Sequence, residues 1–133
     1  MAPEMQKLFD YLFAQAHAAL QDNRSFAPFA ATDWADGQRT QSVTDLPAAI
    51  STPGEHLAAL ITTLSDQAKG GGVKAAGIAF DAVAGDLGDA VCVHLETPDD
   101  AVQVFTPYKR GGDPRPVFAE PLVQDAQARI FKR

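Results

Sequence analysis

The feature that most constrains the fold is a stripe of apolar side chains near the start of the chain. These side chains recur at three- and four-residue spacing, which is the period of an amphipathic α-helix. Pro3 suits the first turn of such a helix, and Asn23 is expected to help end it. The stripe consists of Met5, Leu8, Phe9, Leu12, Phe13, Ala16 and Leu20. A helix this apolar on one side must cover a sheet or a partner.

A second helix is predicted by its start and stop signals. Thr52 can cap the helix, Pro53 fits its first turn, and Glu55 can complete a capping box. The apolar stripe of this helix is Leu57, Leu60, Ile61 and Leu64. Gly70-Gly71-Gly72 should end it after Lys69, because glycine adopts left-handed backbone angles freely. A phosphate-binding loop needs the opposite order, in which glycines follow a strand and open a helix.

Short β-like runs separated by turn residues predict the strands. Two runs, residues 26–33 and 38–44, lie between the helices and flank the turn pair Asp36-Gly37. Pro28 favours either an edge position for the first of them or a place among its first residues. Three further runs form an antiparallel meander after the glycines, namely Val73–Val83, residues 90–96 and residues 101–106.

These elements predict one α+β domain that spans all 133 residues. We expect an antiparallel sheet of about five strands with both main helices on one face, in the order α-β-β-α-β-β-β. The opposite face should be wet or paired with another subunit. A short strand is possible at residues 117–120, and residues 122–131 should form a C-terminal tail or a short helix.

Charge and cysteine content narrow the class of function. The formal net charge is −6, which disfavours binding to the phosphate backbone of a nucleic acid. No apolar run approaches the length that crosses a bilayer, so no membrane role is expected. Cys92 is the only cysteine and no secretory signal is evident, which favours a cytoplasmic location. No cofactor is expected.

Three metal-capable side chains alternate along the middle strand of the meander. Alternation should place Cys92, His94 and Glu96 on one face, and Val91, Val93 and Leu95 on the core face. Successive residues on one face lie about 6.5–7 Å apart, too far for all three to reach one ion from a straight strand. Cys92 is therefore expected to be a packed core residue, and His94 an ordinary histidine of the sheet surface. No metal site and no catalytic residue is predicted.

Aromatic residues give a hint of a binding surface. Trp34 adjoins a polar hairpin, Phe105 and Tyr108 end the meander, and Lys109 and Arg110 follow directly. Packing in the core accounts for most such side chains. Interfaces nevertheless favour partly exposed aromatic residues beside arginine, so these five residues are the predicted binding site.

The order of several short motifs resembles that of small, uncharacterised bacterial α+β proteins. The motifs are Phe26-Ala27-Pro28-Phe29-Ala30, Asp36-Gly37, the capped helix, a strand ending in Phe80-Asp81, the run Val91-Cys92-Val93-His94-Leu95-Glu96, and Thr106-Pro107-Tyr108. This resemblance covers roughly residues 8–120 and implies no activity. The order of elements also looks like profilin-like and roadblock-type domains, which often dimerise and serve as sensors or scaffolds. The small acidic chaperones of bacterial secretion systems are similar in size and charge, but their usual strand order differs.

The leading hypothesis is a non-catalytic, homodimeric module that binds another protein. One alternative is an acidic chaperone or immunity-type antidote for a basic protein partner, whose binding would weaken with salt. A more remote alternative is a metal-dependent or hydrolytic enzyme that uses Cys92 and His94.

Overall fold

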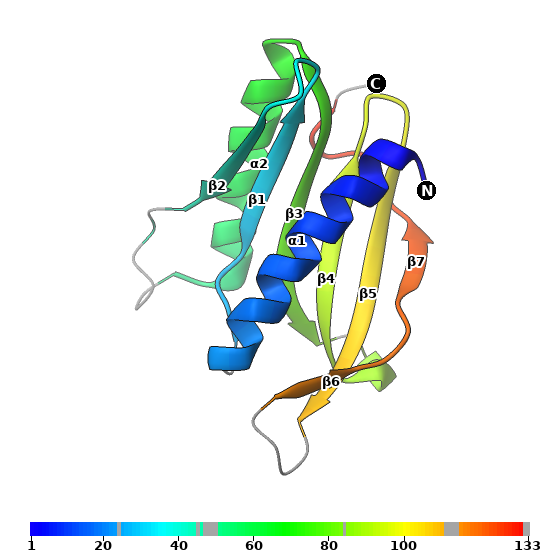
Figure 1. Ribbon diagram of the computed structural model, residues 1–133. Helices are drawn as coiled ribbons and strands as arrows, with labels where there is room; N and C mark the ends of the chain where they lie inside the picture. The colour runs from blue at the N-terminus through cyan, green and yellow to red at the C-terminus, as the bar shows by residue number, and fades with distance from the viewer. Residues whose placement is uncertain (24, 45, 47–50, 84, 111–114, 132–133) are drawn as a thin grey trace.

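The computed structural model describes residues 1–133 except 24, 45, 47–50, 84, 111–114 and 132–133. The described residues form two α-helices, a short 3₁₀ helix and seven strands (Figure 1). In chain order these are α1 (Pro3–Asp22), β1 (Phe29–Trp34), β2 (Arg39–Val43), α2 (Pro53–Lys69), β3 (Val73–Val83), η1 (Gly85–Leu87), β4 (Asp89–Glu96), β5 (Ala101–Arg110), β6 (Pro116–Phe118) and β7 (Leu122–Asp125). The α+β class and the predicted order α-β-β-α-β-β-β are confirmed.

The strands form one antiparallel sheet in the order β2-β1-β3-β4-β5-β6, with β7 also paired to β5. The long strand β5 carries β6 along residues 108–110 and β7 along residues 102–105 of its outer edge. The sheet is therefore larger than the predicted five strands. Of the two alternatives for residues 122–131, a tail or a short helix, the helix is wrong, because residues 122–125 are strand β7 and residues 126–131 contain no helix.

The two helices lie on opposite faces of the sheet, so the prediction of a single covered face is wrong. Figure 1 shows α1 in front of the sheet and α2 behind it. The buried stripe of α1 packs on Ala75, Ala79 and the predicted core residues of β4, Val91, Val93 and Leu95. Leu60 and Leu64 of α2 pack on Ala30, Val73, Ala76 and Ile78. The physical reason is that β3 is apolar on both faces, and each face needs its own cover.

The second helix begins and ends at the predicted residues. The Thr52 side chain accepts a hydrogen bond from the Glu55 amide at 3.2 Å, and the Glu55 carboxylate accepts one from the Thr52 amide at 3.4 Å. Gly71 and Gly72 follow the helix with φ values of +82° and +84°. Side chains rarely adopt this conformation, so the glycines let the chain turn sharply from α2 into β3.

One glycine of β3 allows α1 to approach the sheet closely. A Cβ atom at Gly77 would lie 2.8 Å from Leu12 Cδ1, 2.9 Å from Leu95 Cδ2 and 3.0 Å from the His94 carbonyl oxygen. The carbonyl belongs to the neighbouring strand β4 and is fixed by the ladder. A side chain at this position would therefore push α1 away from the sheet.

We expect Gly77→Ala to lower the free energy of unfolding by about 1–3 kcal/mol through overpacking. Gly54→Ala is the matched control, because the nearest atom that a Cβ there would meet among the described residues is Thr52 Oγ1, at 3.8 Å. Urea denaturation of both variants checks the prediction. Equal stability of Gly77→Ala and the unsubstituted protein would contradict the close approach.

The second helix covers only part of its face of the sheet. Its buried residues pack on β1 and β3, and Ile130 from the C-terminal segment extends this core toward β4. The α2 side of β5 and β7 carries no helix in the described part of the chain. None of the described helices combines the length and hydropathy needed to cross a bilayer.

Candidate functional site

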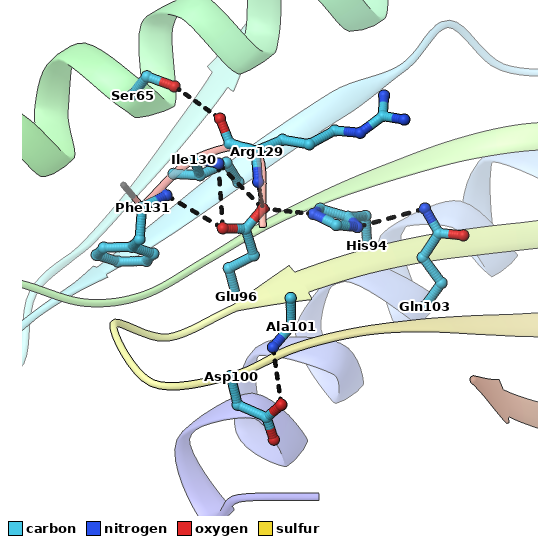
Figure 2. Close-up of polar contacts among 9 residues, drawn as sticks. All are labelled: Ser65, His94, Glu96, Asp100, Ala101, Gln103, Arg129, Ile130 and Phe131. Carbon is cyan, nitrogen blue, oxygen red and sulfur yellow. Dashed lines mark hydrogen bonds and ion pairs between the residues drawn. The ribbon is translucent and has the colours of Figure 1, made fainter. Parts of the chain in front are cut away.

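The most distinctive polar arrangement is a buried carboxylate at the end of β4. Glu96 is fully buried, and its two carboxylate oxygens accept hydrogen bonds from the backbone of the C-terminal segment (Figure 2). The amides of Arg129, Ile130 and Phe131 donate at 2.7–3.1 Å. Ser65 of α2 donates to the Arg129 carbonyl oxygen at 3.2 Å and joins the same segment to the helix. Glu96 therefore anchors residues 129–131 onto the sheet.

The same carboxylate accepts a hydrogen bond from His94. His94 Nε2 lies 2.6 Å from Glu96 Oε2, and both side chains are at most 5% exposed. An ionised carboxylate only accepts hydrogen bonds, so Nε2 of His94 carries a proton. On its other side, His94 Nδ1 faces Gln103 Nε2 at 3.4 Å.

The pKa values of Glu96 and Cys92 favour a structural role for both side chains. Burial raises the pKa of Glu96, but hydrogen bonds from His94 and the three backbone amides outweigh burial and bring that pKa below its ordinary value. Burial alone raises the pKa of the Cys92 thiol to about 12. Cys92 is thus a protonated thiol at neutral pH, and a protonated thiol is a poor nucleophile and a poor metal ligand.

A small cavity opens beside His94, between α2 and the sheet. Its volume is about 60 Å³. It is lined by Leu57, Ile61, Ile78, Phe80, His94, Gln103 and Arg129. The apolar part of the lining comes from α2 and β3, and the polar part comes from β4, β5 and the C-terminal segment. None of the lining side chains is a Ser, Thr or Cys nucleophile.

An apolar row crosses the sheet next to this cavity. Phe80, Cys92, Phe105 and Leu122 are paired in register across β3, β4, β5 and β7, so they share the α2 side. Cys92 is fully buried, Phe80 and Phe105 are half-buried, and Leu122 is 45% exposed. The neighbouring row, Ile78, His94, Gln103 and Gln124, is more polar.

The structure joins only two members of the predicted metal-capable set. His94 contacts Glu96, whereas Cys92 has no hydrogen bond to either of them within the described residues. His56 contacts Thr44, and His17 lies against Phe13 and Phe118. The described ranges contain no group of three His, Cys, Asp or Glu side chains arranged to hold a metal ion. The expectation that His94 lies on the sheet surface is wrong, because it is 4% exposed.

Two of the predicted binding residues, Tyr108 and Arg110, lie on the α1 side and help hold the fold together. Tyr108 is only 4% exposed, so the prediction that it is an exposed anchor is wrong. Its hydroxyl donates to Asp81 at 2.8 Å, and burial raises the pKa of both groups. The guanidinium of Arg110 donates to the carbonyl oxygens of Leu20 and Asn23 at the end of α1.

The other predicted binding residues are dispersed. Trp34 packs beside α2 at one end of β1, and its indole N–H donates to Thr40 at 2.9 Å. Phe105 lies in the apolar row, and the exposed Lys109 lies further along the same side of β5. Of the predicted set, only Phe105 belongs to the region beside the cavity.

Sequence reasoning missed Gln103 and Arg129 as members of this region. Gln103 lies opposite His94 on β5, a pairing that the predicted meander implies once its register is fixed. Arg129 reaches the cavity because Glu96 binds the segment that carries it. No local sequence pattern predicts the contact between Glu96 and this segment. Comparison with known proteins gave no match to a protein-family model, to a curated protein or to a solved structure.

Proposed function

We propose that this protein is a non-catalytic, homodimeric module that binds other proteins. The observation that carries the proposal is the apolar row Phe80, Cys92, Phe105 and Leu122, which runs from beside α2 onto β5 and β7, where no described helix covers the sheet and Phe105 and Leu122 remain partly exposed. Contiguous exposed apolar surface on a small domain is typical of an interaction site. The buried thiol of Cys92, with its pKa raised to about 12, supports a binding role over a nucleophilic one.

The outer edge of β7 is the favoured place for the second copy. All four residues of β7 are exposed, and Leu122 and Val123 are 45% and 56% exposed. The opposite edge strand, β2, is mainly polar and carries Arg39, a residue type that discourages edge pairing. Antiparallel pairing of two β7 strands would continue the sheet and join the two apolar rows into one strip. A single cysteine and the absence of a disulfide fit a cytoplasmic setting.

Light scattering at high micromolar concentration tests the dimer. We expect the mass of a dimer for the unsubstituted protein and the mass of a monomer for Val123→Lys, because two lysines near the two-fold axis repel each other. Val117→Lys is the matched control, since Val117 is 70% exposed on β6, outside β7. A monomeric mass for the unsubstituted protein would refute the dimer, and loss of the dimer in Val117→Lys would refute the assigned edge.

A further inference from the structure

The cavity beside His94 has the size of one branched aliphatic group. Its volume of about 60 Å³ is well below the ~150 Å³ of an engineered cavity that binds benzene. Leu57, Ile61 and Phe80 at its walls are each half-buried, so the cavity opens to solvent. An apolar group that entered from outside would complete the packing between α2 and β3.

Hydrogen-bond donors gather on one side of this opening. The side chain of Arg129 has no hydrogen bond or ion pair among the described residues, and Figure 2 shows it extending from the C-terminal segment past His94. Gln103 faces His94 Nδ1 with one amide N–H, which leaves its second N–H for another acceptor. The Nε2 proton of His94 is not available to a ligand, because it is donated to Glu96.

The guanidinium of Arg129 and the second amide N–H of Gln103 lie beside an apolar cavity. Together they complement a carboxylate that is attached to a short aliphatic group. We propose that this cavity binds an aliphatic side chain next to a carboxylate, presented by a partner protein, with Arg129 and Gln103 holding the carboxylate. The choice of a protein rests on the proposed function. The apolar row supports that choice, because it continues from Phe80 across the sheet. A chain segment could make further contacts along this row, whereas a free small acid is too short to reach them.

Nuclear magnetic resonance titration of the full ¹⁵N-labelled chain tests the site with a defined probe. The probe is N-acetyl-Gly-Leu with a free carboxylate, and its C-terminal amide is the neutral control. We expect the acid to shift the amide signals of Gln103 and Arg129 with a dissociation constant on the order of millimolar, as befits so small a ligand. The neutral amide should bind about tenfold more weakly or worse, because it loses a charged hydrogen-bond partner.

Three variants separate the roles of charge and cavity. Arg129→Gln should weaken binding of the acid about tenfold and leave the neutral amide unchanged. Lys74→Gln removes an exposed cation from β3, outside the cavity lining, and should change neither affinity. Ile61→Phe should fill the cavity and abolish binding of both probes. If Ile61→Phe fails to fold, Arg129→Gln still tests the site, because it alters only an exposed side chain.

Equal affinity for acid and amide, or unchanged affinity in Arg129→Gln, would overturn the inference. Tighter binding of free 4-methylpentanoate than of the dipeptide would overturn the assignment to a protein partner. These outcomes are independent of the light-scattering result, since a dimer without a carboxylate site would refute the inference alone. A monomer that binds the dipeptide would refute the dimer alone.

Discussion

Glu96→Ala is expected to lower the free energy of unfolding by about 3–5 kcal/mol at neutral pH, because each buried donor left without an acceptor costs about 1–3 kcal/mol. The substitution leaves three backbone N–H groups of residues 129–131 without their acceptor, and it leaves the His94 Nε2 proton unpaired. Ile130, which is 1% exposed, depends on the same contacts for its place in the α2-side core. Urea denaturation monitored by far-ultraviolet circular dichroism measures the change.

The pH dependence of this loss identifies the carboxylate as its cause. The folded-state pKa of Glu96 lies below its ordinary value, so its stabilising contribution is complete above the unfolded-state pKa and disappears as the pH falls through the folded-state pKa. The difference between Glu96→Ala and the unsubstituted protein should therefore shrink in acid. Glu120→Ala removes an exposed carboxylate and should change stability by less than about 0.5 kcal/mol. A loss in Glu96→Ala that stays constant with pH would contradict this account.

Local signals predicted most of the secondary structure. The helix α1 follows the period of its apolar stripe, and α2 begins at the capping box of Thr52 and Glu55 and ends before Gly71 and Gly72. The alternation in β4 correctly predicted that Val91, Val93 and Leu95 face the core, and in the structure that core lies under α1. Each of these features depends on residues that are close in sequence, which is why single-sequence reasoning reaches them.

The face that each helix covers was not predictable from the helices alone, because an apolar stripe fits either side of a sheet. The relevant signal is in β3, where Ala75 and Ala79 face α1 while Ala76 and Ile78 face α2. A strand that is apolar at nearly every position is typical of a sheet covered on both faces. The run at residues 75–80 carries that pattern.

The C-terminal segment shows the limit of local patterns. Leu122 and Val123 are β7 residues although their neighbours suggested a loose helical stripe, because pairing with β5 decides the conformation. Further on, residues 129–131 are held by Glu96, more than thirty residues earlier in the chain. The sequence therefore singled out His94 and Glu96 of the candidate site. It could not identify Gln103 and Arg129, because their place beside His94 depends on tertiary contacts.

Leu12→Ala is expected to lower the free energy of unfolding by about 2–5 kcal/mol. Leu12 is fully buried at the centre of the α1 stripe and faces the gap that Gly77 leaves in β3, so truncation opens a cavity that neither the helix nor the sheet can close. Leu122→Ala makes the same chemical change at a side chain that is 45% exposed, and under dilute, monomeric conditions it should cost less than about 1 kcal/mol. Urea denaturation of the two variants in parallel measures the contrast. Similar losses at both positions would mean that α1 does not seal this face of the sheet.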